Sequence, residues 1–342
     1  MQVLGLDVGF GFTKATNGRD TQIFKSVVGD AAEATFSEQL MPTKTSLGRH
    51  LQINGEIFYV GELAEQQSRG RGFTLDPGQF LSKYAKTLAV SACAPLTDSN
   101  QPVRLVTGLP INFFRKHKDV LTQLLQQRHT ATLFKPGGEK EERVVNVERV
   151  RVIPQPFGAL FNLMLNDLGK PISQRFITEK IGVIDIGFRT ADYTISDKTR
   201  YSERGSQSTD SGISIAFTAL ANALQEKSGV VIELFRLYDA VTRGTIKIRG
   251  KRYDITALVK QAFTGLATRV ATEANRLWSD DWDVDAIVIS GGGGAVLAPY
   301  LAPLLEGEVI PVPPEQDARL NNVHGYQKYG LHLWSAGGSA SS

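Results

Sequence analysis

The chain has 342 residues, of which 42% are hydrophobic and 21% charged, a composition typical of a soluble globular protein. Its length exceeds the usual size of one domain, so we expect two domains. Its 38 Lys and Arg residues nearly balance its 35 Asp and Glu residues. The resulting formal charge of +3 is too small to indicate a surface that binds nucleic acid directly.

Cysteine usage and hydropathy indicate the compartment. The single cysteine, Cys93, excludes an intrachain disulfide framework and a cysteine-based metal cluster, and we interpret it as a small buried hydrophobic residue. No run approaches the roughly 18 apolar residues that a membrane span needs. Met1 and Gln2 lead directly into a predicted strand, which leaves no room for a signal peptide. We therefore expect a cytoplasmic protein without a membrane partner.

The N-terminal part of the chain predicts strands and helices in alternation. Val3–Leu6 and Thr13–Thr16 predict a β-hairpin, which a polar, irregular region follows to about Gly48. A second hairpin spans Leu51–Val60, because apolar residues alternate around Asn54-Gly55. The elements expected next are a helix at 77–94, a strand at 104–110, a helix at 119–127, a charged turn at 135–142 and a strand at 144–153.

The C-terminal part begins where Pro154-Gln155-Pro156 interrupts a strand, which marks the predicted crossing between two domains. The elements expected after it are a helix at 159–168, a hairpin around residue 187, a helix at 213–226, a basic hairpin at 245–255, a helix at 255–278 and a strand at 286–290. This alternation favours an α/β architecture with central sheets. Residues 335–342 are rich in Ser, Gly and Ala, so we expect a disordered tail.

One short pattern, Asp-x-Gly-Phe at the end of an apolar run, occurs in both halves, in Leu6–Lys14 and in Ile184–Asp192. A single copy is compatible with an ordinary turn, whereas two opposed hairpins of this kind suit a nucleotide's phosphates and its Mg²⁺. In the first copy, Gly9 and Gly11 allow a tight turn whose N–H groups point at phosphate oxygens. Lys14 is placed to reach the β- and γ-phosphates, and Asp7 to hold Mg²⁺ through water.

The second copy supplies another carboxylate at a strand end, Asp185, with Gly187 at the turn and Thr190 as a hydroxyl donor. If two hairpins from two domains hold one phosphate chain, the site depends on domain closure. Gly291–Gly294 predict a loop without side chains that leaves room for adenine and ribose, before a helix that starts near Ala295. Gln155 is suited either to orient a water toward the γ-phosphate or to cap a helix at a hinge.

The order of these motifs resembles the actin/Hsp70/sugar-kinase superfamily. Leu105–Pro110, Gly61-Glu62 and Asn321–Tyr326 further resemble the actin-like proteins of the ParM/StbA plasmid-segregation type. The resemblance spans nearly the whole chain and implies the actin-like fold: two α/β domains, each with a central mixed sheet flanked by helices, and a nucleotide in the interdomain cleft. It implies domain I at 1–154, completed by about 316–334, and domain II at 155–315.

The resemblance also assigns roles to residues. Asp7 matches the Mg²⁺-associated acid of the first phosphate loop, Lys14 the phosphate-binding lysine and Asp185 the second-loop acid. Gln155 lies where actin has its water-positioning glutamine and ParM-like proteins an acid. Arg189 departs from actin, which has glycine there, and the sequence leaves open whether it contacts phosphate or another subunit. The implied nucleotide-binding residues are Gly9, Phe10, Gly11, Phe12, Thr13, Lys14, Gly187, Phe188, Arg189, Thr190, Gly212, Gly291, Gly292, Gly293 and Gly294.

The implied function is an ATPase, with GTP as an alternative nucleotide, that polymerises into filaments and segregates plasmid DNA through a DNA-binding adaptor protein. Two other hypotheses compete with it. A small-molecule kinase of the same superfamily would need a carboxylate as base for an acceptor hydroxyl, for which Asp192 and Asp210 are candidates. A chaperone or a membrane-linked scaffold is the third hypothesis, although we find neither a long appended substrate domain nor an amphipathic anchor.

Overall fold

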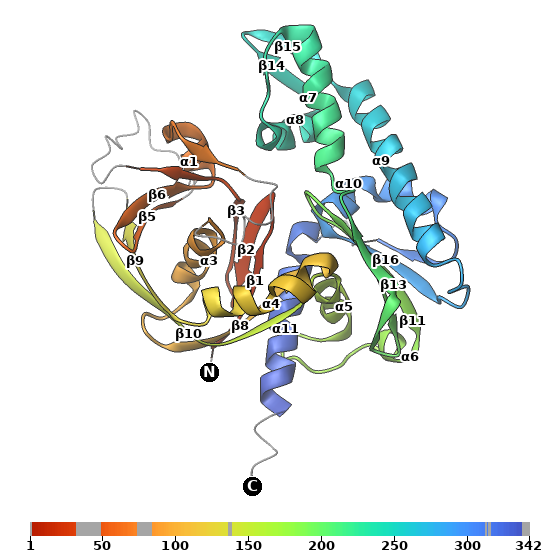
Figure 1. The fold of residues 1–342 in the computed structure, drawn as a ribbon, viewed down its shortest axis with the longest axis horizontal. Helices are drawn as coiled ribbons and strands as arrows, with labels where there is room; N and C mark the ends of the chain where they lie inside the picture. Colours follow the sequence, from red (N-terminus) through yellow and green to blue (C-terminus); the bar gives the residue numbers. More distant parts are fainter. Residues whose placement is uncertain are drawn as a thin grey trace. The chain divides into compact units, whose positions relative to one another are not determined.

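A computed structural model describes residues 2–31, 49–73, 84–135, 139–311, 313 and 316–336 (Figure 1). The chain forms two compact units: unit 1 comprises Met1–Ser173 and Asn322–Ser342, and unit 2 comprises Gln174–Asn321. The first boundary therefore lies after residue 173, later than the predicted residue 154, and the chain returns to unit 1 after residue 321. The helix that follows Gln155 belongs to unit 1 because it packs closely on the C-terminal helix, where a Cβ on Gly325 would overlap the carbonyl oxygen of Gly158.

Unit 1 is built on one mixed sheet of ten strands, in the order β3-β2-β1-β8-β10-β9-β5-β6-β4-β7. Its strands are β1 (Gln2–Val8), β2 (Phe12–Thr16), β3 (Thr21–Lys25), β4 (Val28–Asp30), β5 (Arg49–Ile53), β6 (Glu56–Val60), β7 (Arg71–Gly72), β8 (Pro102–Leu109), β9 (Arg128–Phe134) and β10 (Lys140–Pro154). Its helices are α1 (Glu62–Gln67), α3 (Ala85–Cys93), η2 (Ala94–Leu96), α4 (Ile111–Leu125), α5 (Pro156–Met164) and α11 (Asn321–Ala336).

Unit 2 contains a five-stranded sheet, in the order β13-β12-β11-β16-β17, and a separate two-stranded hairpin. Its strands are β11 (Lys180–Ile186), β12 (Ala191–Asp197), β13 (Arg200–Thr209), β14 (Thr245–Ile248), β15 (Lys251–Asp254), β16 (Ala286–Ser290) and β17 (Val309–Ile310). Its helices are α6 (Arg175–Thr178), α7 (Ser214–Ser228), η3 (Leu234–Arg236), α8 (Leu237–Arg243), α9 (Thr256–Leu277), α10 (Gly291–Leu301), η4 (Ala302–Leu304) and η5 (Ala318–Leu320).

The two units repeat one topology. In unit 1, β3, β2 and β1 form an antiparallel meander, and β8 and β10 extend it in parallel. In unit 2, β13, β12 and β11 form the same meander, and β16 and β17 extend it in parallel. Each copy of the Asp-x-Gly-Phe motif joins the two strands of its meander that come first in the chain. The sequence repeat is thus also a repeat of structure.

Most predicted elements are confirmed, and the exceptions have local causes. The hairpin at Asn54-Gly55 pairs β5 with β6, and both turn residues have positive φ, as a tight hairpin turn requires. The region expected to be irregular up to Gly48 contains β3 and β4, while residues 32–48 lie outside the described residues. Helix α4 begins at Ile111 rather than at 119, because Phe113 and Phe114 pack against the core. Helix α5 begins earlier than predicted because Pro156 occupies its first turn, where a missing N–H costs nothing.

Two further predictions concern the glycine run and the tail. Gly291–Gly294 do not form a loop before a helix near 295: they are the first turn of α10. Ser335 lies within α11 rather than in a disordered tail, and residues 337–342 lie outside the described residues. The predicted helix at 77–94 is described only from residue 84, where α3 follows.

Apolar side chains form the core of each unit. In unit 1, the buried face of the sheet packs on α3, whose Cys93 is 3% exposed. Burial raises the pKa of its thiol to about 12, as expected for a structural cysteine. In unit 2, α9 packs on α7 and α10, and Trp278 at its end donates an Nε1–H hydrogen bond of 2.9 Å to Gly205 O. None of the described helices is long and apolar enough to cross a membrane.

Candidate nucleotide site

The first loop, residues 9–12, joins β1 to β2. Gly9 N donates to Phe12 O at 3.1 Å and closes the turn. In the strand register, Asp7 lies opposite Lys14, and Lys14 Nζ contacts Asp7 Oδ2 at 2.7 Å. Asp7 is 2% exposed. The positive charge of Lys14 is therefore fixed beside the turn, where it can help to hold an anion.

A residue that sequence reasoning missed, Ser26, anchors this loop. Ser26 Oγ donates to Gly9 O at 2.6 Å, Ser26 N donates to Gly11 O at 2.9 Å, and Thr13 Oγ1 lies 2.9 Å from Ser26 Oγ. The Thr13 side chain, predicted to bind nucleotide, is fully buried in this contact, and Phe10 is also buried. Their side chains thus shape the loop from inside. No motif signals Ser26, because only the return of β3 along β2 brings it there.

Gln155 lies beside the first loop. Its Nε2 approaches Asp7 Oδ1 at 3.4 Å, its backbone N donates to Leu109 O at 2.8 Å, and its carbonyl accepts from Tyr326 Oη at 3.3 Å. The side chain makes no capping hydrogen bond to α5, so the alternative interpretation of Gln155 as a helix cap is wrong. Strand β8 and helix α11 therefore hold the residue with its amide toward Asp7.

The second loop, residues 187–190, repeats the first. Gly187 N donates to Thr190 O at 2.9 Å, and Asp185 lies opposite Asp192 as Asp7 lies opposite Lys14. Asp185 is buried at the end of β11. The backbone of Gly212 packs directly against the second loop. Gly212 N donates to Arg189 O at 2.9 Å, and a Cβ on Gly212 would overlap the backbone of Arg189. Gly212 therefore supports the loop by close backbone approach.

Polar side chains of the second loop already have partners within unit 2. Thr190 Oγ1 donates to Asp192 Oδ2 at 2.9 Å, and Ser208 Oγ donates to Asp192 Oδ1. Arg189 forms an ion pair of 3.3 Å with Asp210. Asp192 is buried and both of its carboxylate oxygens already accept a hydrogen bond, and Asp210 faces a cation, so neither is placed as a base for an acceptor hydroxyl. The geometry gives the small-molecule kinase hypothesis no support.

Phe188 of the second loop belongs to an aromatic cluster. Its ring lies 5.8 Å from that of Phe217 on α7 and 5.3 Å from that of Tyr238 on α8, between centroids. The side chain is buried, so only the backbone of Phe188 is available to a ligand. The loop is thereby coupled by packing to both helices.

The four glycines bring the start of α10 against the second loop. Gly291 has φ of 83°, and a Cβ there would overlap Asp185 Oδ1 and Ile186 O. A Cβ on Gly293 would lie 2.8 Å from Ile186 O. The first N–H groups of α10 have no side-chain cap at Ser290, and a helix N-terminus attracts negative charge.

Another residue outside the predicted set, Arg319, lies along this helix start. A Cβ on Gly292 would come 2.9 Å from Arg319 Cγ, and the guanidinium pairs with Asp317, with Nη2 at 2.6 Å from Oδ2. The hydrogen bond to Asp317 raises the pKa of Arg319 above its usual value. The resemblance implied that residues 316–334 complete domain I, whereas η5 packs on α10 within unit 2, which is why sequence reasoning missed Arg319.

The arrangement is compatible with a hydrated magnesium ion. Among the described residues, no group of three or more His, Cys, Asp or Glu side chains is placed to hold a metal by itself. Mg²⁺ bound with a nucleotide needs no such cage, since waters and phosphates supply most of its ligands and one or two carboxylates suffice. Asp7 in unit 1 and Asp185 in unit 2 are each buried at a strand end beside a loop, so each is a carboxylate of the kind that such an ion uses.

Comparisons with known proteins agree with this geometry. Residues 5–158 match the family model "actin like proteins N terminal domain", and residues 183–302 match "archaeal actin homologue MreB-like, C-terminal". No curated protein matches the chain.

Solved structures extend the likeness over the whole chain. A ParM filament of 15 strands from Clostridium botulinum aligns with a TM-score of 0.80 and 23% identity, over 96% of this chain and 98% of that one. A non-polymerisable quadruple mutant of pCBH ParM gives 0.79 and 24%, with the same coverage. An archaeal actin homologue in complex with ADP gives 0.77 and 22%, over 96% and 99%. At these identities the likeness shows the fold, which confirms the expected two-domain actin-like architecture.

Proposed function

We propose, from the premise that this chain belongs to the actin-like proteins, that it binds and hydrolyses a nucleoside triphosphate and assembles into filaments. The observation that carries the proposal is the repeated hairpin. Two sheets of the same topology each place a buried aspartate at a strand end, followed by a glycine turn closed by the same hydrogen bond. Such a pair of turns suits a chain of phosphates.

Different residues of the chain would bind the phosphates, position the attacking water and bind the nucleoside. The N–H groups of the first loop and Lys14 bind phosphate oxygens, and Lys14 adds a point charge whose position Asp7 fixes. Gln155 holds a water in line for attack, because its amide is positioned by its backbone and directed to the Asp7 side of the loop. The glycines at the start of α10 leave room beside Arg319, and the nucleoside end lies there.

Asp7 and Asp185 would hold Mg²⁺ through water. When bound, the ion supplies positive charge that neutralises the phosphate oxygens during transfer. Either ATP or GTP is compatible with a helix start that lacks side chains.

For assembly, the partner is a second copy of this chain. The similar ParM from Clostridium botulinum was solved as a filament, and the similar archaeal homologue was solved with ADP. We extend both properties to this chain: nucleotide-bound copies polymerise in the cytoplasm, and hydrolysis weakens their contacts. With a nearly balanced charge, the filament would engage plasmid DNA through a DNA-binding adaptor protein rather than directly.

The test combines light scattering, electron microscopy and phosphate release on the purified chain with Mg²⁺ and ATP or GTP. We expect nucleotide-dependent polymers. Substitution of Gln155→Ala should leave nucleotide binding largely intact, slow hydrolysis by about 100-fold and lengthen filament lifetime. Asp185→Asn should act in the same direction.

The matched control is Gln207→Ala, since Gln207 bonds to Glu273 on α9 and not to either loop. Its turnover should equal that of the wild type. Absence of any polymer over a broad range of protein concentration would reject the filament, and unchanged turnover of both site variants would reject the roles of Gln155 and Asp185.

A further inference from the structure

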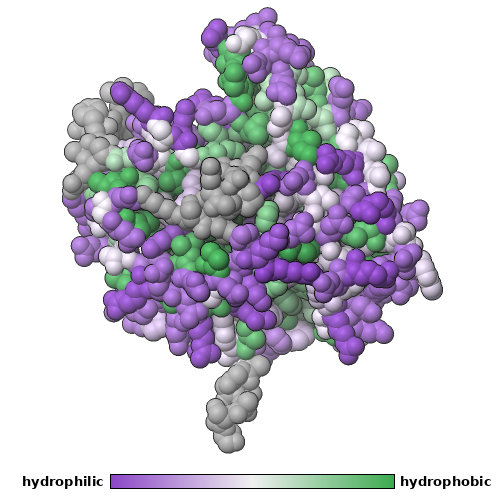
Figure 2. All heavy atoms as spheres, viewed as in Figure 1, coloured by the Kyte–Doolittle hydropathy of each residue, from purple (hydrophilic) through white to green (hydrophobic). Residues whose placement is uncertain are grey.

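The two ends of helix α9 carry segments of opposite charge. The hairpin β14–β15 directly precedes α9, and residues 245–254 contain four Lys or Arg residues and one Asp. The acidic loop, residues 279–285, directly follows α9 and contains four Asp residues. At 1.5 Å per residue, the 22 residues of α9 separate the two segments by about 33 Å (Figure 1). In Figure 2, hydrophilic side chains gather over the hairpin end of unit 2.

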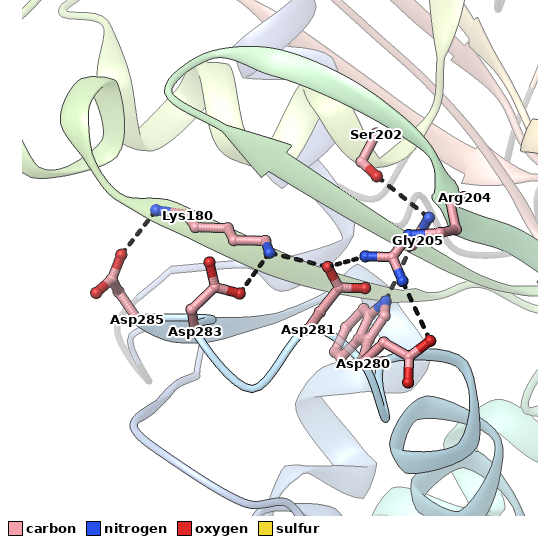
Figure 3. A network of polar contacts seen from close by, with 9 residues as sticks. Lys180, Ser202, Arg204, Gly205, Asp280, Asp281, Asp283 and Asp285 are labelled. Carbon is pink, nitrogen blue, oxygen red and sulfur yellow. Dashed lines mark hydrogen bonds and ion pairs between the residues drawn. The ribbon is translucent and has the colours of Figure 1, made fainter.

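Ion pairs fix the acidic loop to the sheet (Figure 3). Asp281 is 4% exposed, and its Oδ1 accepts from Lys180 Nζ at 2.8 Å and from Arg204 Nη2 at 2.6 Å. Lys180 also contacts Asp283 at 2.5 Å, and its backbone N donates to Asp285 at 2.8 Å. The loop is therefore held in one conformation.

The same loop keeps charge in excess of its local partners. Asp281 Oδ2 is buried without a hydrogen-bond partner among the described residues, and Asp280 makes only a long 3.5 Å contact with Arg204. The side chain of Asp280 is 82% exposed. Two local cations thus face four carboxylates, which leaves a negative surface for another molecule.

An exposed tryptophan stands in the middle of this loop. Trp282 is 89% exposed and follows the buried Asp281 directly. Large exposed aromatic residues on rigid supports are frequent anchors of protein interfaces, and a tryptophan face also attracts Arg and Lys cations. A partner for this loop should therefore be positively charged and offer guanidinium or ammonium groups.

The hairpin at the other end meets this description. Lys247 and Arg252 lie directly opposite each other in the β14–β15 register, an arrangement of like charges that destabilises a hairpin. Both are exposed, and no ion pair among the described residues engages either of them. Lys251 and Arg249 add two exposed cations at the turn. This concentration of uncompensated charge is readily explained by an acidic partner.

The geometry points to a head-to-tail contact in which the acidic loop of one copy, with Trp282, docks on the hairpin β14–β15 of the next copy. Because the two surfaces lie at opposite ends of α9, one chain cannot join them within itself. The contact is heterologous, so each added copy presents a new surface for the next one. The inference rests on the proposed filament and identifies one of its subunit interfaces.

Charge exchange tests this contact. The loop variant carries Asp280→Lys and Asp283→Lys, and the hairpin variant carries Lys247→Glu and Arg252→Glu. Each variant alone would place like charges together, so we expect its critical concentration for nucleotide-dependent polymerisation to rise at least about tenfold. An equimolar mixture should polymerise, since copies alternating along the filament then have opposite charges at every contact.

Three controls separate the causes. Asp20→Lys with Asp98→Lys, two exposed carboxylates of unit 1, should polymerise like the wild type alone and should not rescue the hairpin variant. Trp282→Ala should raise the critical concentration without being rescued by the hairpin variant. Nucleotide binding and circular dichroism should be unchanged in all variants, which shows that the chains are folded.

The outcomes distinguish the two proposals. A wild type that never polymerises contradicts both the filament and this contact. The head-to-tail contact is contradicted if the wild type polymerises and the charge variants have the same critical concentration as the wild type. It is also contradicted if both folded variants do not polymerise alone and do not polymerise when mixed. Neither result contradicts the filament itself. Rescue in the mixture, together with a critical concentration of the wild type that rises with salt, supports the contact.

Discussion

The two strand-end carboxylates meet different neighbours, and this difference separates the roles of the two loops. Asp7 faces a lysine and forms a buried ion pair with it. Asp185 belongs to a hairpin whose opposite residue, Asp192, accepts hydrogen bonds from the hydroxyls of Thr190 and Ser208. The first loop therefore has a fixed positive charge, which suits phosphate binding. The second loop has none at that register position, and its Arg189 is directed to Asp210.

The Asp7–Lys14 pair allows a quantitative prediction. Lys14→Met should lower the free energy of unfolding by about 3–5 kcal/mol, because it leaves a buried carboxylate without its cation. The double variant Asp7→Asn with Lys14→Met should be more stable than Lys14→Met alone, since no charge is then buried. Urea unfolding of the four proteins of the cycle, followed at the transition of unit 1, measures this.

The exposed pair Arg236–Glu233 provides the control: Arg236→Met should have no comparable effect. The stabilising role of the buried Asp7–Lys14 ion pair would be contradicted if Lys14→Met were as stable as the wild type. It would also be contradicted if the double variant were the least stable of the four proteins.

At the scale of elements, each strand–turn–strand unit is completed by a helix that begins at the neighbouring parallel strand. Strand β16 ends at Ser290, and α10 begins at once with four glycines. Glycine is required at position 291, where φ is positive and a side chain would overlap Asp185 and Ile186. The sequence predicted these glycines as part of the nucleotide site but not as a helix, because glycine is a weak helix former and the contact with β11 is long-range.

A pair of glycine substitutions tests this element. Gly291→Ala should destabilise unit 2 and weaken nucleotide binding, because the start of α10 must move away from the second loop. Gly265→Ala, in the exposed middle of α9, should instead be neutral or stabilise the protein by up to about 1 kcal/mol, since a Cβ there meets no atom within 4 Å. Thermal unfolding and nucleotide titration measure both. Equal behaviour of the two variants would contradict the role given to Gly291.

At the scale of the whole molecule, the chain consists of two units with related sheets and separate cores. Unit 1 enlarges the shared five-stranded pattern with β9, β5, β6, β4 and β7, whereas unit 2 adds the separate hairpin β14–β15 and the long helix α9. These additional elements give the two units different surfaces. In unit 2 they include the basic hairpin β14–β15 and the helix α9, which the acidic loop follows.

Two cores predict unfolding that is not two-state. With Trp282→Phe, the fluorescence of buried Trp278 reports unit 2 and that of Trp334 reports α11 of unit 1. In two proteins that each keep only one of these two tryptophans, thermal unfolding without nucleotide should occur at two different temperatures. A nucleotide at about 100 times its Kd should stabilise the protein by about 2.7 kcal/mol and raise at least the transition of Trp278. Coincident transitions would contradict independent units, and no shift would contradict nucleotide binding.

The sequence by itself determined the elements whose signals are local. Asn54-Gly55 fixed a hairpin, apolar periodicity fixed α7 and α9 closely, and the repeated Asp-x-Gly-Phe located both loops. It also identified the superfamily, because those motifs occur in a characteristic order.

Only the tertiary structure decided what depends on contacts between distant residues. Ser26 reaches the first loop through strand pairing, Arg319 reaches α10 through the packing of η5, and Thr13 and Phe188 turn inward because their neighbours bury them. The boundary between the units lies later in the chain than predicted for the same reason, because α5 packs on α11, with Lys328 Nζ bonded to the carbonyl of Asn162, 166 residues earlier. Such contacts leave no period or spacing in the sequence, since they arise only when the sheet has brought its strands together.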